Sequence, residues 1–138
     1  MLPVQQIDES QAGDAPQENF TGRVRMQKLA EQGGMTKVEL LAVFFDAGAH
    51  TRPHTHPSEQ MLYFVQGSGF VQFPGEERQR VEEGGVVVIP AGVVHMHGAR
   101  DDEAICHVAL RAADGLTNWH PDGVPDEWRG LLASDGHG

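Results

Sequence analysis

The chain has 138 residues, a formal net charge of −10 and a single cysteine, Cys106. This length supports one hydrophobic core, and 20 acidic against 10 basic residues argue against binding to nucleic acid or to an anionic membrane. We therefore expect a small-molecule partner, and we interpret Cys106 as a buried apolar residue rather than a nucleophile. No apolar stretch approaches membrane-spanning length and residues 1–10 lack a signal-peptide pattern, so the sequence predicts a cytoplasmic protein.

From the N-terminus onward, a polar segment gives way to a series of short apolar runs. Residues 1–19 are predicted to be a flexible arm, or an extension that pairs with a sheet edge, and residues 20–138 a single domain with a C-terminal extension. Runs rich in Val, Phe and Tyr, separated by turns that contain Gly and Pro, predict an all-β barrel or sandwich. These runs are residues 38–45, 60–65, 69–73, 86–90 and 104–110. Residues 126–133, with Trp128 and Leu131 on one face, predict one short C-terminal helix.

Two short segments place four histidines and a glutamine on what the pattern predicts to be neighbouring strands. Because side chains alternate faces along a strand, His54 and His56 point the same way, and Gln60 shares their parity if the strand is re-entered in register. His95 and His97 repeat this spacing on the second segment. Neutral imidazole is the commonest protein ligand of transition metals, so the two segments predict a metal site.

The strand that begins at Gln60 predicts a pocket that is apolar beyond the metal. If Gln60 points inward, so do Leu62 and Phe64, whereas Met61 and Tyr63 face the other side of the sheet. Residues 38–45 are apolar on both faces. The sequence leaves open which of these two faces lines the cavity.

The histidine segments fit two spaced motifs, Gly48-x5-His54-x-His56-x3-Gln60-x6-Gly67 and Gly84-x5-Pro90-x-Gly92-x2-His95. With both motifs at these spacings, the chain resembles the cupin family over roughly residues 38–110. The resemblance implies a double-stranded β-helix, or jelly-roll barrel. It also implies a metal held by His54, His56, Gln60 and His95. Gln60 stands where the family most often has a glutamate, and a neutral amide leaves a divalent ion its full charge.

The cupin architecture also implies a role for the last strand of the barrel. His107 would point inward there, with Ile105, Ala109 and Arg111 on the same face and Cys106 facing away. An inward histidine in an otherwise apolar cavity needs a polar partner.

A closer resemblance is to small bacterial cupins that include manganese-dependent hydroxynitrile lyases. It is carried by residues 19–25 ahead of the barrel, by the two histidine motifs and by His107. It implies a metal-dependent lyase that cleaves or forms cyanohydrins with one divalent ion per chain, manganese first and Fe, Ni, Co, Zn or Cu as alternatives. His97 and His107 are the implied proton-transfer residues. Pro53 and Met96 stand where we expect tryptophans in those lyases.

Two other functions stay open: an Fe(II)-type cupin oxygenase, against which Gln60 weighs, and a non-catalytic small-molecule-binding cupin. For His97, a role in the pocket and a place as a hydrogen-bonded core residue are both compatible with the sequence. His50, His120 and His137 are interpreted as surface residues. The expected assembly is a homodimer made through sheet edges, or a higher homo-oligomer.

Overall fold

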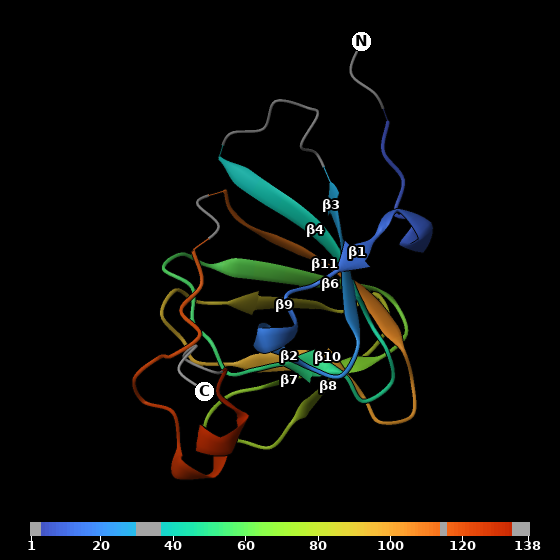
Figure 1. Cartoon of the computed structure of the whole chain (residues 1–138). Coiled ribbons are helices and arrows are strands. Elements are labelled where there is room, and N and C mark those ends of the chain that lie inside the picture. Colours follow the sequence, from blue (N-terminus) through green and yellow to red (C-terminus); the bar gives the residue numbers. More distant parts are fainter. Residues whose placement is uncertain (1–3, 30–36, 114–115, 134–138) are drawn as a thin grey trace.

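Two antiparallel sheets form the protein, as the computed structural model in Figure 1 shows for the residues it describes, 4–29, 37–113 and 116–133. The larger sheet has the order β1 (Gly13–Asp14), β3 (Val24–Leu29), β4 (Val38–Phe45), β11 (Ile105–Ala112), β6 (Gln60–Gln66) and β9 (Val86–Ile89). The smaller sheet has the order β2 (Phe20–Thr21), β5 (His50–Thr51), β10 (Met96–Ala99), β7 (Gly69–Gln72) and β8 (Gln79–Val81). The predicted all-β fold is confirmed.

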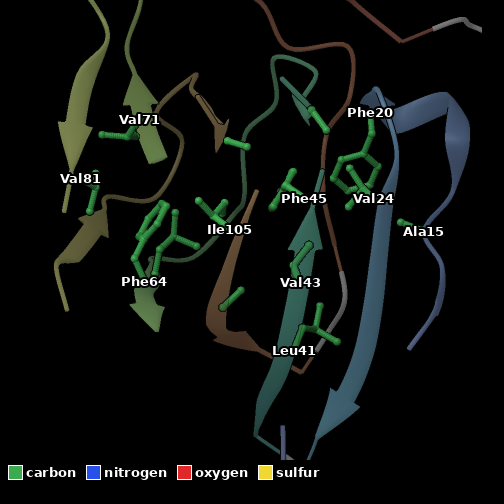
Figure 2. Packing of buried hydrophobic residues seen from close by; sticks show 14 of the residues in the cluster. Ala15, Phe20, Val24, Leu41, Val43, Phe45, Phe64, Val71, Val81 and Ile105 are labelled. Atoms are coloured by element: carbon green, nitrogen blue, oxygen red, sulfur yellow. The ribbon is translucent and has the colours of Figure 1, made fainter. Parts of the chain in front are cut away.

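The main hydrophobic core is built on the inward face of β4. Leu41, Val43 and Phe45 form a row along this strand, with Phe20 beside Phe45 (Figure 2). The alternate residues of the same strand belong to a second, smaller cluster on the opposite face. The structure thereby decides which face of residues 38–45 is directed at the cavity.

The alternation predicted for β6 is confirmed. Gln60, Leu62 and Phe64 are buried, whereas Met61 and Tyr63 are 36% and 43% exposed. The inward side of this strand is polar at Gln60 and apolar at Leu62 and Phe64, so the candidate site lies at the Gln60 end of the strand.

The inward face of β11 is also as expected. Ile105, His107 and Ala109 are buried on the core side, and Cys106 belongs to the smaller cluster on the other face. The register between β11 and β6 shifts between Cys106 and His107, and beyond the shift His107 pairs with Phe64.

Two glycines allow the strands of the smaller sheet to approach closely. A Cβ placed on Gly98 of β10 would lie 2.5 Å from the Ala49 carbonyl oxygen and 2.5 Å from His50 Cα. A Cβ on Gly69 of β7 would overlap the Gly98 carbonyl oxygen. Because no side chain intervenes, β10 can lie between β5 and β7, which fixes the histidines beside it.

The terminal segments pack against the sheets. Near the N-terminus, η1 (Glu9–Gln11), β1 and η2 (Gln17–Asn19) precede β2, and β1 pairs with the edge strand β3. The flexibility of this arm and the domain boundary at residue 19 stay predictions. The short C-terminal helix is confirmed as the 3-10 helix η4 (Asp126–Leu131), whose Trp128 is buried against Phe70 and Met96. Within the described residues, no helix has the length and apolar character needed to span a membrane.

Candidate metal centre

The two histidine motifs meet at an antiparallel bridge between His54 and His95. The backbone N–H of each residue donates to the carbonyl oxygen of the other at 3.1 Å. This pairing holds the two imidazole rings 4.2 Å apart, and the ring of His56 lies 4.9 Å from His54 and 5.5 Å from His95. Gln60, the first residue of β6, lines the same cavity as His54 and His56.

Three histidines have nitrogens close enough to hold one metal ion. The ligand atoms of His54, His95 and His97 all lie within 4.8 Å of one another. This group shares His54 and His95 with the set that the sequence motifs predict, but contains His97 in place of His56. The geometry therefore supports a metal site at the bridge and leaves two choices for the imidazole that completes it.

Each imidazole of the predicted set has its Nδ1 beside a backbone carbonyl oxygen. His54 and His95 each donate to the carbonyl two residues earlier, at 2.8 Å and 2.9 Å, and His56 Nδ1 lies 3.3 Å from the Leu116 carbonyl. Because a carbonyl only accepts, the proton of His54 and of His95 is on Nδ1 and the lone pair is on Nε2, whereas His56 Nδ1 lies equally close, at 3.3 Å, to the Thr117 hydroxyl. Metal-ligating histidines characteristically have this arrangement.

Within the described part of the chain, two of the proposed ligand atoms have no hydrogen-bond partner, as expected of atoms that hold a metal ion. Gln60 Oε1 and His95 Nε2 are buried, and neither has a hydrogen-bond partner among the described residues. An unpartnered buried polar atom costs about 1–3 kcal/mol, and a cation bound between these atoms would remove that cost. Imidazole nitrogen and an amide oxygen form a donor set that suits divalent transition metals.

Burial keeps the imidazoles of His54 and His95 neutral at physiological pH. Burial, reinforced by the neighbouring His95 and His56, holds the pKa of His54 well below its usual range. Burial lowers the pKa of His95 to about 4. The rings are therefore in the protonation state that a metal ligand requires.

A hydrogen bond between His97 of β10 and His107 of β11 connects the two sheets. His107 Nε2 lies 3.0 Å from His97 Nδ1, and both side chains line the cavity. The His107 ring packs between Phe45 and Phe64, with centroids 5.1 Å and 5.3 Å away. Burial lowers the pKa of His107 to about 3 and also holds that of His97 well below its usual range. Both rings are thus neutral near pH 7, and a proton can pass between them.

The cavity has a volume of about 250 Å³ and a largely apolar wall. Trp119 forms one side of it, with its ring 4.5 Å from the His54 ring and 6.1 Å from Phe20. Pro53 and Met96 stand where tryptophans are expected in the lyases and provide no aromatic surface, whereas Trp119 contributes an aromatic ring to the cavity wall. The sequence carries no local signal for this, because Trp119 reaches the site through a bridge between Thr55 and Asn118, residues far apart in the chain.

Comparison with known proteins agrees with this architecture. The family model of the cupin domain matches residues 42–110. The chain belongs to the cupin family. This cupin is 32% identical over 130 residues to (R)-mandelonitrile lyase of Granulicella tundricola, an alignment that covers 93% of this chain and 99% of that lyase. The resemblance to the hydroxynitrile lyase-like cupins is thereby confirmed.

Two other relatives of this cupin are informative. A cupin-like protein of Thermotoga maritima superimposes with a TM-score of 0.76 at 31% identity, covering 93% of this chain and 98% of that structure. Acireductone dioxygenase 1 of Sorghum bicolor is 31% identical over 78 residues, which are 54% of this chain and 42% of the dioxygenase. The family thus includes a lyase and a dioxygenase, and the cupin fold alone does not choose between these reactions.

One histidine of this cupin, His50, does not lie where the sequence predicts. His50 is wrongly assigned to the surface: it is 9% exposed, its Nδ1 donates to the Thr51 carbonyl at 2.8 Å, and its ring contacts Phe70. The reason is that β5 is an interior strand between β2 and β10, which a strand of two residues does not reveal in the sequence. His120 is exposed, and His137 lies outside the described residues.

Proposed function

We propose that this cupin is a metal-dependent lyase of the hydroxynitrile lyase type, which cleaves a cyanohydrin to an aldehyde and cyanide or forms it in reverse. The proposed ligands of one divalent ion per chain are His54 Nε2, His56 Nε2, Gln60 Oε1 and His95 Nε2. The observation that carries the proposal is the Nδ1–carbonyl pairing of three imidazoles around a buried, unpartnered amide oxygen. The similarity to (R)-mandelonitrile lyase supports the reaction type.

His97 is assigned to proton transfer rather than to the metal. Its Nδ1 faces His107 Nε2 instead of a carbonyl oxygen, so its tautomer is not fixed as it is in His54 and His95. A ring whose proton can move to a neighbouring ring suits acid–base work, and a ring whose tautomer is fixed suits coordination. His56 therefore completes the proposed ligand set.

A bound divalent ion would supply a Lewis acid that polarises the substrate oxygen. In the cleavage direction, His107 takes the hydroxyl proton of the cyanohydrin, directly or through one water, and His97 can share that proton. The bond between the carbinol carbon and the nitrile carbon breaks, its electron pair leaves with cyanide, and the carbonyl forms. The proton then leaves with cyanide as HCN. No atom is oxidised or reduced, so no further cofactor is needed.

The test is elemental analysis followed by an assay. Protein purified without added metal is expected to contain about one divalent ion per chain, with manganese proposed first, and to release benzaldehyde from mandelonitrile. His56→Ala and Gln60→Ala are expected to lose the ion, whereas His120→Ala, at an exposed position, should keep it. Retention of metal by His56→Ala together with its loss from His97→Ala would replace the proposed ligand set by His54, His95 and His97.

A second candidate is a cupin oxygenase, favoured by the match to acireductone dioxygenase over 54% of this chain. The neutral Gln60 weighs against it, because non-haem Fe(II) oxygenases characteristically use two histidines and one carboxylate. Oxygen uptake by the Fe(II)-loaded protein with a diketone or enediol substrate would identify this activity. Metal binding with neither activity would favour a small-molecule-binding cupin.

The homodimer is proposed on the exposed apolar side chains of the larger sheet. Met61 and Tyr63 of β6 lie beside Val86 and Val88 of the edge strand β9, and Val86 and Val88 are 53% and 63% exposed. Apolar side chains gathered at a sheet edge favour contact with a second copy. Sedimentation analysis of the protein and of Val88→Lys tests it, with dissociation expected for the variant. The cytoplasmic location stays a prediction.

A further inference from the structure

The wall of the cavity contains a single fixed charge. Of the described residues that line it, Arg111 is the only charged one, and none carries a carboxylate. Arg111 lies near the end of β11, in the inward register of His107 and Ala109. Its side chain is 19% exposed, so its charge is only partly screened by water.

The guanidinium of Arg111 is held in place by two partners. Nε and Nη2 donate to Glu39 Oε1 at 3.3 Å and 3.0 Å, and Nη1 donates to Thr117 Oγ1 at 2.8 Å. Glu39 is the cross-strand neighbour of Arg111 on β4. Three of the five N–H groups of the guanidinium are thus used within the described residues, and two are left for a ligand.

Arg111 also lies where the cavity meets the surface. Together with Gln60 it lines both the cavity and a second groove that includes Met61 and Val88 on the outside of the larger sheet. On the cavity side, Thr117 Oγ1 joins the guanidinium to His56 Nδ1, 3.3 Å away. The cation therefore stands at the entrance, one hydroxyl group away from a proposed metal ligand.

We infer that the substrate of this cavity carries a carboxylate, which Arg111 binds at the entrance while the reacting end of the molecule faces His97 and His107. The inference rests on the proposed function, because it takes the cavity as the site of cyanohydrin chemistry. The substrate class is then a carboxylate-bearing aldehyde and its cyanohydrin. Trp119 and Phe20 provide an apolar surface for the carbon skeleton between the two ends.

The expected strength of this recognition is modest. A charge-assisted hydrogen bond contributes enough free energy for a preference of about tenfold or more. Glu39 fixes the guanidinium but also offsets part of its charge. We therefore expect the carboxylate to bind about tenfold more tightly than a neutral molecule of the same shape, the lower end of that range.

The test compares 4-carboxybenzaldehyde with the neutral 4-carbamoylbenzaldehyde by calorimetric titration of the metal-loaded protein, with no cyanide present. The wild type is expected to favour the carboxylate about tenfold, and Arg111→Gln should bind both probes nearly equally. Arg25→Gln is the matched control, because Arg25 pairs with Glu9 and a backbone carbonyl but does not line the cavity. It should keep the wild-type preference.

Glu39→Gln provides a second, opposite test. Removing the compensating carboxylate leaves the Arg111 charge in place, so the preference for the carboxylate probe should exceed that of the wild type. A full preference in Arg111→Gln, or an equal loss in Arg25→Gln, would overturn the inference by assigning the effect to the metal or to the general field of the protein.

These outcomes are separable from those of the lyase assay. Cleavage of mandelonitrile without any carboxylate preference overturns the inference and keeps the proposed function. An Arg111-dependent preference in a metal-loaded protein that cleaves no cyanohydrin overturns the proposed function and keeps Arg111 as a ligand-binding residue.

Discussion

The inward faces of β6 and β11 differ at their two ends. At one end they carry Gln60 and Arg111, which line the cavity, and at the other Phe64 and Ile105, which are closely packed in the core. The strand alternation is the same throughout, so the difference between the reactive end and the packed end is made by a few side chains. His107, paired with Phe64 in the sheet, lies at the junction of the two ends.

This contrast explains how an apolar barrel can hold a polar site. The rings of Phe45 and Phe64 contact His107, so its position is set by apolar side chains that carry no acid or base. At the reactive end, the smaller Ala109 leaves space where a large residue would fill the cavity. The packed end therefore provides the rigidity that the reactive end needs.

The largest effect is expected at the packed end. Phe64 is fully buried, so Phe64→Ala should lower the free energy of unfolding by about 3–5 kcal/mol, through lost burial and the cavity left behind. Its neighbour Tyr63 is 43% exposed on the other face, and Tyr63→Ala should cost no more than about 1 kcal/mol. Guanidinium chloride unfolding of both variants gives the comparison. Equal losses would mean that the two faces of β6 do not differ as described.

At the junction, His107→Ala should retain the metal and lower the rate of cyanohydrin cleavage by a factor of about 10²–10⁴, the usual contribution of acid–base catalysis. His97→Ala is expected to be the milder change, because His97 acts through its hydrogen bond to His107. Steady-state kinetics with parallel metal analysis measures both. Because the alanine leaves a cavity, His107→Gln serves as a variant of similar volume. Full activity in His107→Ala or His107→Gln would remove His107 from the mechanism.

At the reactive end, Gln60→Glu tests the charge of the metal site. The variant should keep the metal but bind azide about tenfold more weakly, because a carboxylate removes one unit of positive charge from the centre. Gln66→Glu is the matched control, since Gln66 lies on the same strand and is exposed. Calorimetric titration with azide is the measurement. Equal or tighter azide binding by Gln60→Glu would show that the neutrality of the amide is unimportant.

The same contrast marks what the sequence could and could not predict. The alternation of β6 follows from local spacing, because a strand fixes the direction of every second side chain, whereas the grouping of His95 with His54 and His56 is implied by the cupin resemblance. The role of β4 could not be predicted, since both of its faces are apolar. Trp119 and Thr117 could not be predicted either, because only long-range pairing of the C-terminal segment brings them to the cavity.

The smallest effect on the site is expected at Cys106, which lies next to His107 but on the other face of β11. Cys106→Ala should change metal content and cleavage rate less than about twofold, because the thiol does not line the cavity.

Burial, followed by the nearby charge of Glu9, raises the pKa of Cys106 to about 11. Only the thiolate reacts with iodoacetamide, so labelling of the folded protein should rise toward pH 11 rather than toward the ordinary thiol value. A raised pKa means that the native state favours the neutral thiol, so ionisation of Cys106 lowers the free energy of unfolding. Cys106 therefore stabilises the fold below its unfolded pKa and loses that contribution as the pH rises toward 11. Rapid labelling at pH 8, or a large loss of cleavage in Cys106→Ala, would show that the two faces of β11 are not separated in function.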